Sequence, residues 1–208
     1  MVHSSKDYLN VVVTFSIAYA VALACSIGGL EYNGFSIILI CMLISFFVHW
    51  MAFIPSFFLK TEKYYDISGT LAYVCVIFTA LFLTKSESGG TLNVRSTVTI
   101  VLVLIWAIRL GVFLFSRVLK AGEDRRFREV KNFFAKFLVW WSMSALWVFL
   151  TTLNALVMII NNVAYYNDYY FIIGLFIWLG GFVFEVIADE QKRRFRQIDS
   201  NKSKFISS

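Results

Sequence analysis

The sequence predicts an all-α fold, a polytopic bundle of about six transmembrane helices. Of the 208 residues, 59% are hydrophobic and 15% are charged, whereas soluble domains have about half and about a quarter. The hydrophobic residues come in blocks, each long enough to cross a hydrocarbon core of roughly 30 Å. The chain has a single proline, Pro55, and no alternating runs of the kind that build β-barrels.

Each expected helix is an apolar run bounded by polar residues. The first follows Lys6 and Asp7, a flank without the positive charge of a signal peptide, and we expect a retained span. The second contains Pro55 near its end, and the third is the shortest. The fourth contains Arg109, the fifth is rich in tryptophan, and the sixth runs into a charged tail. The expected spans are Leu9–Leu30, Phe35–Leu59, Ile67–Thr84, Thr97–Ser116, Phe133–Ile160 and Tyr169–Ala188.

The connections between these spans are unequal in length and charge. Three are short, and Lys85–Ser96 contains a flexible Ser-Gly-Gly turn. The fourth connection, Arg117–Asn132, is the outlier, because charged residues of both signs crowd into it. No linker and no internal repeat divides the chain, so we expect a single transmembrane domain over residues 1–208.

The basic residues predict the orientation of the chain. With six spans, the N-terminus, the second and fourth connections and the tail share one side, which collects most Lys and Arg. The opposite side has only Lys85 and Arg95. The positive-inside rule then places both termini in the cytosol, with the protein in the endoplasmic reticulum or another organelle membrane. This asymmetry accounts for the net charge of +6, and no nucleic-acid partner is predicted.

Ionisable residues within spans cost at least a few kcal/mol, so each needs a partner or a role. Arg109 in the fourth span and Glu185 in the sixth are the clear cases. Arg109 either lines a polar pocket that opens toward the basic side or forms a structural ion pair with Glu185, and the sequence favours neither. His49 has no second ligand-type residue nearby, so we interpret it as a hydrogen-bonded core residue.

Two charged segments are candidate ligand-binding sites. The first is the tail, where four side chains at i, i+4, i+8 and i+11 line one stripe of a helix: Glu185, Asp189, Arg193 and Arg196. The second is Gly122–Phe127, whose arginines could grip phosphate through paired hydrogen bonds. Positive-inside topology and attraction to anionic lipid, about 1 kcal/mol per basic residue, explain the same charges, and composition alone favours this explanation.

The common motifs of soluble nucleotide and metal chemistry are missing from the sequence. There is no P-loop, Rossmann glycine motif, GxSxG or HExxH, and no metal site is predicted. Cys25, Cys41 and Cys75 lie within apolar runs, where we expect buried, reduced thiols. Aromatic residues make up 18% of the chain, and we expect interface belts and packing rather than the walls of a pocket.

Four segments of the chain are distinctive when taken together and in order: Tyr65–Thr70, Trp106–Arg117, Gly122–Phe127 and Ala188–Phe195. Together they resemble a membrane family, long catalogued as a domain of unknown function and related to steroid 5-alpha-reductases, and the resemblance covers about residues 60–205. It implies a reductase that uses NADPH to reduce an activated carbon–carbon double bond in a lipid or steroid-like substrate. It also implies five residues around the cofactor: Arg109, Arg117, Asp189, Arg193 and Arg196.

The chain departs from that family in two respects. The family continues into a Gly-Leu-Trp segment, an Arg-His-Pro-Asn-Tyr-type motif and a further helix, so we expect a chain truncated before part of the cofactor site. Steroid reductases also carry a carboxylate just before a Leu-Pro-Ser, whereas Ala52-Phe53-Ile54-Pro55-Ser56 offers none. No catalytic proton donor is therefore assigned.

Two functions stay open on this basis. The first is a membrane-embedded, NADPH-dependent reductase that acts on CH–CH groups of a hydrophobic lipid or steroid-like substrate, with activity in this short form in question. The second is a non-catalytic structural or accessory subunit of a membrane complex. A transporter is less favoured, because no inverted repeat or paired broken helices are visible. Membrane lipids are expected partners in each case.

Overall fold

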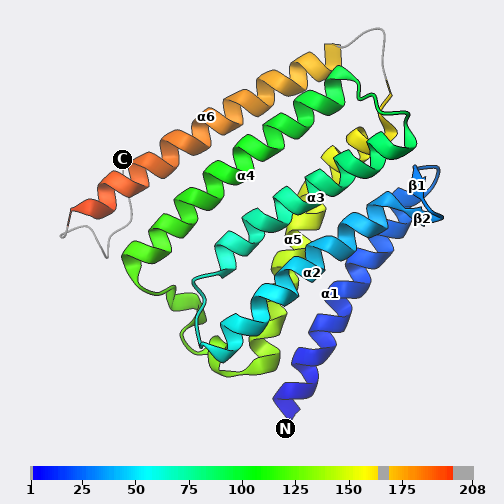
Figure 1. Cartoon of the computed structure of the whole chain (residues 1–208). Coiled ribbons are helices and arrows are strands. Elements are labelled where there is room, and N and C mark those ends of the chain that lie inside the picture. Colours follow the sequence, from blue (N-terminus) through cyan, green and yellow to red (C-terminus); the bar gives the residue numbers. More distant parts are fainter. Residues whose placement is uncertain (1, 164–168, 199–208) are drawn as a thin grey trace. The chain divides into compact units, whose positions relative to one another are not determined.

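A computed structural model gives the structure of the chain and describes residues 2–163 and 169–198. These residues fall into two units, the first built from helices α1 to α5 and the second from α6 (Figure 1). Six helices in the described residues are long and apolar enough to cross a membrane. The prediction of an all-α, multi-pass membrane protein is confirmed. That both units form one domain stays a prediction.

The helices coincide with the predicted apolar runs, and several extend beyond them. The third was predicted to be the shortest, yet it has 23 residues and continues past both expected ends. The fourth and sixth continue into charged segments, because a helix need not stop where the hydrocarbon core ends. The helices are α1 (Val2–Ser26), α2 (Ile37–Phe58), α3 (Tyr65–Glu87), α4 (Val94–Ala121), α5 (Phe134–Asn161) and α6 (Tyr169–Gln197).

The connections contain short elements that the sequence analysis did not predict. Between α1 and α2, strand β1 (Glu31–Tyr32) pairs antiparallel with β2 (Phe35–Ser36). The turn residues Asn33 and Gly34 have φ values of 50° and 82°, which a two-residue type I′ hairpin requires. The Asn-Gly pair was the missed signal. The α4–α5 connection holds two 3₁₀ turns, η1 (Arg125–Phe127) and η2 (Val130–Asn132).

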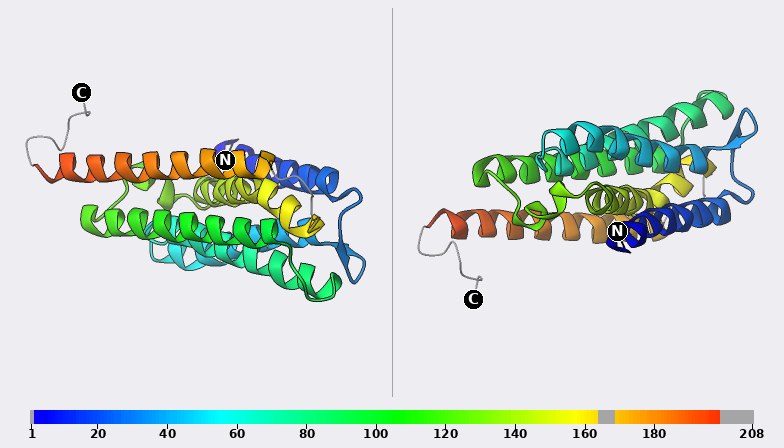
Figure 2. Two further views of the ribbon diagram at one scale, coloured as in Figure 1. Left: turned by 90° about the horizontal axis from the view of Figure 1, so that it is seen from above. Right: turned by 90° about the horizontal axis from the view of Figure 1, so that it is seen from below.

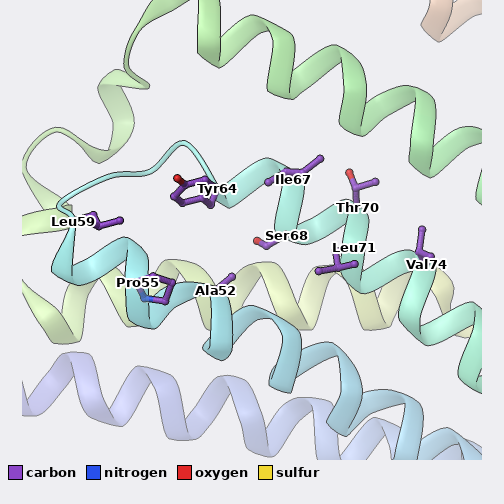
Figure 3. A pocket seen from close by; sticks show the side chains of 9 residues that line it. All are labelled: Ala52, Pro55, Leu59, Tyr64, Ile67, Ser68, Thr70, Leu71 and Val74. Atoms are coloured by element: carbon purple, nitrogen blue, oxygen red, sulfur yellow. The ribbon is translucent and has the colours of Figure 1, made fainter.

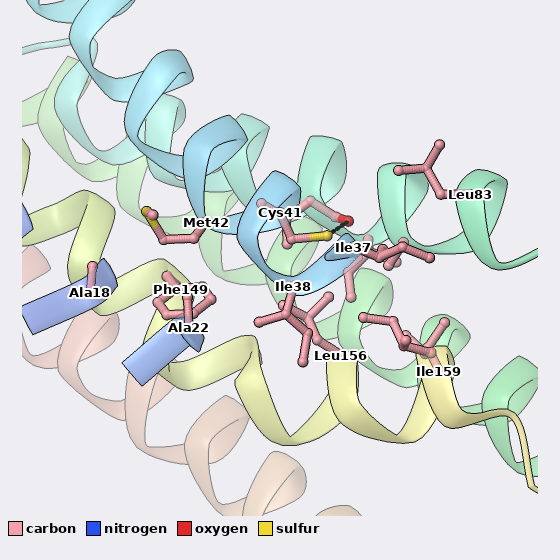
Figure 4. Packing of buried hydrophobic residues seen from close by; sticks show 14 of the residues in the cluster. Ala18, Ala22, Ile37, Ile38, Cys41, Met42, Leu83, Phe149, Leu156 and Ile159 are labelled. Atoms are coloured by element: carbon pink, nitrogen blue, oxygen red, sulfur yellow. Dashed lines mark hydrogen bonds between the residues drawn. The ribbon is translucent and has the colours of Figure 1, made fainter. Parts of the chain in front are cut away.

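Helix α5 is the centre of the first unit, where it contacts α1, α2, α3 and α4 (Figure 2). The largest buried cluster lies between these helices (Figure 4). Ala18 and Ala22 of α1 are fully buried, and their small side chains let α1 approach closely, as is usual between membrane helices. The three cysteines are free thiols, and the expected burial is confirmed for Cys41 alone, since Cys25 and Cys75 are half-buried. Other members of the cluster are Ile37, Met42, Phe46, Ile77, Phe149 and Leu156.

Polar contacts join α2 to α5 inside the bundle. Ser45 Oγ donates to the carbonyl of Ala145 at 2.8 Å. His49 is fully buried, with Nδ1 2.7 Å from the Ser45 carbonyl and Nε2 3.0 Å from Ser144 Oγ. Because a carbonyl can only accept, Nδ1 carries the proton and Nε2 accepts from the serine hydroxyl. The interpretation of His49 as a hydrogen-bonded core residue is confirmed.

Candidate functional site

The second and fourth connections meet at one end of the first unit (Figure 1). Glu62, in the α2–α3 connection, accepts hydrogen bonds from the Asp124 N–H at 2.9 Å and from Lys131 Nζ at 2.8 Å. Both donors belong to the α4–α5 connection. The prediction that these two connections share a side is therefore confirmed, while the assignment of that side to the cytosol stays a prediction.

Glu62 is a buried carboxylate, with only 3% of its surface exposed. Burial alone would raise the pKa of Glu62, but the hydrogen bonds from Lys131 and Asp124 outweigh it and hold the pKa below its usual range. The side chain is therefore ionised at neutral pH and fixes the charged connection against the α2–α3 connection. Sequence reasoning missed this role, since a single acid in a short connection does not reveal partners that lie far along the chain.

Aromatic packing also holds the α4–α5 connection against the helices. Phe127 of η1 is 1% exposed, and its ring centroid lies 4.7 Å from that of Tyr65 and 5.2 Å from that of Trp140. The Tyr65 hydroxyl donates to the Trp140 carbonyl at 3.1 Å. Phe127 is the last residue of Gly122–Phe127, for which a phosphate grip was the less favoured of two explanations, and its packing occupies part of that segment.

The arginines at this end differ in how firmly carboxylates hold them. Arg126 donates hydrogen bonds from Nε and Nη2 to both carboxylate oxygens of Asp124, at 2.5 to 3.0 Å. Arg117 lies 3.8 Å from Asp66, and its side chain is 41% exposed. That separation exceeds hydrogen-bonding distance, so the guanidinium keeps N–H donors for another oxyanion. Among these two, Arg117 is the one that suits a phosphate.

The Asp66–Arg117 pair is the outer end of a seam between α3 and α4. Further along the seam, a β-carbon on Gly111 would meet Thr70, and Tyr73 packs edge-on against Trp106 with ring centroids 5.1 Å apart. Two segments that carry the family resemblance, Tyr65–Thr70 and Trp106–Arg117, thus meet along one helix–helix contact. Their residues have a structural role whether or not a cofactor binds.

A partly open cavity of about 560 Å³ lies beside this charged end, between α2 and α3 (Figure 3). The hydroxyl groups of Ser68 and Thr70 are engaged within α3, since Ser68 Oγ donates to the Tyr65 carbonyl at 2.7 Å and Thr70 Oγ1 to the Asp66 carbonyl at 3.4 Å. The remaining lining is apolar apart from Tyr64, which is 44% exposed. The lining residues are Ala52, Pro55, Leu59, Tyr64, Ile67, Ser68, Thr70, Leu71 and Val74.

The five predicted cofactor residues lie on two helices. Arg109 and Arg117 are on α4, about 12 Å apart along its axis at 1.5 Å per residue. The other three, Asp189, Arg193 and Arg196, are on α6, which continues unbroken through the charged tail and so preserves the predicted stripe. Because α4 and α6 belong to separate units, the approach of the two sets to one another stays a prediction.

Glu190 is a second acidic residue that sequence reasoning missed. Its carboxylate accepts from Arg193 Nε at 2.6 Å and from Arg194 Nε at 2.7 Å. These are contacts between residues three and four apart on a helix, which neighbour one another on its surface. Arg193, a predicted cofactor-binding residue, therefore already has a carboxylate partner within α6.

A protein family described as "Protein of unknown function (DUF1295)" matches residues 52–208. The match covers well over half of the chain and includes the seam, the cavity-lining part of α3 and the whole of α6. It also contains the region of about 60–205 on which the resemblance was based. Comparison with curated proteins and with solved structures finds no significant match.

Proposed function

The chain belongs to the DUF1295 family, and we propose that it is a membrane-embedded, NADPH-dependent reductase that acts on a carbon–carbon double bond of a lipid or steroid-like substrate. The observation that carries this proposal is the position of an apolar cavity directly beside a charged end. Ile67 of α3 lines the cavity, and the preceding residue, Asp66, pairs with Arg117. An apolar substrate and an anionic cofactor would thus have adjoining surfaces.

The cavity suits a hydrophobic substrate. Its volume of about 560 Å³ falls within the range of about 300–1,000 Å³ typical of small-molecule sites. It lies between α2 and α3, both long and apolar enough to cross a membrane. A substrate dissolved in the bilayer would therefore reach the cavity from the side without passing through water.

The basic residues fit the phosphate groups of NADPH in part. Arg117 keeps donors beyond its long contact with Asp66, and an arginine fork matches phosphate oxygens well. Arg193 and Arg196 of α6 would add further contacts, with Arg109 and Asp189 completing the proposed site. When bound, NADPH supplies a hydride. The chain's own contribution is to hold the phosphates at the charged end and the apolar substrate beside it.

A second candidate function, a non-catalytic structural or accessory subunit, has its own supporting observation. Most cations of the α4–α5 connection are neutralised within the chain, which is typical of a structural tie rather than a ligand grip. Three such pairs lie at this end: Glu62–Lys131, Glu123–Arg128 and Asp124–Arg126.

Deuteride transfer separates the two functions. The protein, in membranes, is incubated with NADPH deuterated at its transferable position and with a 3-oxo-4-ene steroid as the activated double bond. A reductase yields a saturated steroid that carries deuterium, and Arg117→Ala lowers the yield at limiting NADPH. Arg128→Ala is the matched control, because Arg128 pairs with Glu123 at the exposed surface. Absence of deuterated product would favour the accessory role.

A further inference from the structure

We propose that the α2–α3 cavity holds one acyl chain of an anionic phospholipid, with the lipid phosphate at Lys60 and Lys63. The proposal deepens the reductase proposal and rests on its assignment of this cavity to a lipid, since it names the lipid class that the cavity selects. It rests on the depth of the cavity, on the charges at its outer end, and on where the nearby carboxylates are held.

The cavity has the depth of one membrane leaflet. Its lining on this side runs from Tyr64, the N-cap of α3, to Val74, about 15 Å along the helix axis at 1.5 Å per residue. A bilayer has a hydrocarbon core of roughly 30 Å, so this is about half its thickness. An acyl chain anchored at one surface spans the same depth, and the aliphatic side chains of Ile67, Leu71 and Val74 would line it (Figure 3).

The outer end of the cavity carries positive charge. Leu59 and Tyr64 line this end, and the residues between them include Lys60 and Lys63, both exposed. The Lys60 ammonium lies 3.8 Å from the centre of the Phe57 ring, which holds it at the end of α2. Each lysine near a membrane surface contributes about 1 kcal/mol of attraction to anionic lipid.

The carboxylates nearest these lysines are engaged elsewhere. Glu62 lies between Lys60 and Lys63 in sequence, but its side chain is buried against Lys131 and Asp124. Asp66 is held toward α4 by Arg117. The α2–α3 connection therefore presents its two lysines to the membrane surface without an exposed acid between them. Charge complementarity thus favours an anionic headgroup over a zwitterionic one.

Native mass spectrometry of the full chain, released from nanodiscs, tests this proposal. The nanodiscs contain phosphatidylglycerol and phosphatidylcholine in equal amounts, with matched acyl chains. We expect phosphatidylglycerol to be retained preferentially, and the double variant Lys60→Ala/Lys63→Ala to lower its retention at least about fivefold. Lys85→Ala, which removes a lysine at the other end of α3, is the charge control.

A cavity-filling variant tests the position of the acyl chain. Leu71→Trp fills the cavity and is expected to abolish retention of both lipids. Leu43→Trp is the matched control, since Leu43 is 51% exposed on α2, close to the 54% of Leu71, and does not line the cavity.

Equal retention of the two lipids by the wild type would overturn the proposal. So would unchanged retention in Lys60→Ala/Lys63→Ala or in Leu71→Trp. NADPH-dependent stabilisation is measured in the same preparations. If the lipid proposal fails while NADPH still stabilises the protein, the reductase proposal stands, and the reverse result separates the two in the same way.

Discussion

Thr70 lies directly against Gly111: a β-carbon built on Gly111 would stand 1.8 Å from Thr70 Oγ1 and 2.7 Å from Thr70 Cβ. No real β-carbon tolerates such a separation, so α3 and α4 touch at a point where only glycine fits. The Asp66–Arg117 pair lies at the outer end of the same seam. The close approach therefore fixes how α3 and α4, the two helices that carry Asp66 and Arg117, pack against each other.

Gly111→Ala is expected to destabilise the protein by about 1–3 kcal/mol, because overpacking forces side-chain and backbone shifts. Thermal unfolding in a fixed detergent measures the effect. Thr70→Gly in the same chain removes the clashing atoms and should restore part of the lost stability. Gly69→Ala is the matched control, since no atom lies within 4 Å of a β-carbon there. Equal losses for Gly69→Ala and Gly111→Ala would refute the steric account of the seam.

Glu62→Gln is expected to lower the free energy of unfolding by about 1–3 kcal/mol near neutral pH, because it removes the ion pair with Lys131. Folding lowers the pKa of Glu62, so the unfolded state binds the proton at higher pH than the folded state. The contribution is therefore fully present above the ordinary Glu pKa of 4.5 and is lost as the pH falls through the lower, folded pKa.

Chemical unfolding of wild type and Glu62→Gln across this pH range checks the sign. The difference between the two should shrink below pH 4.5 and stay constant above it. A difference that grew on acidification would show that Glu62 does not act as an ionised tether.

Glu190→Gln is expected to tighten NADPH binding, if the charged end of α6 contacts the phosphates. The substitution releases Arg193 and Arg194 from their shared carboxylate and leaves both guanidinium groups available to another oxyanion. Arg193→Ala and Arg196→Ala should weaken binding. Titration with NADPH at two salt concentrations measures these effects, because phosphate contacts by arginine weaken with ionic strength. Unchanged affinity in all three variants would remove α6 from the proposed site.

Much of the fold could be predicted because long apolar runs in the sequence indicate membrane helices. The ends of α3, α4 and α6 could not be predicted in the same way. Hydropathy marks where the hydrocarbon core ends, whereas a helix continues as long as its backbone hydrogen bonds do. The Asn33-Gly34 hairpin could have been predicted from the turn residues alone.

The site was predictable only in its parts. Asp66, Gly111 and Arg117 all lie in segments singled out from the sequence, but nothing there indicates that α3 and α4 bring them into one seam. That depends on the register of two packed helices. The role of Glu62 was invisible for the same reason, since its partners Asp124 and Lys131 lie in another connection.

Thermal stabilisation by NADPH tests the central claim most directly, because it requires no knowledge of the substrate. Purified wild-type protein in nanodiscs is heated with and without saturating NADPH. The reductase proposal predicts a clear rise in Tm for wild type and Arg128→Ala, and a smaller rise for Arg117→Ala. A wild-type Tm that does not change with saturating NADPH would contradict it.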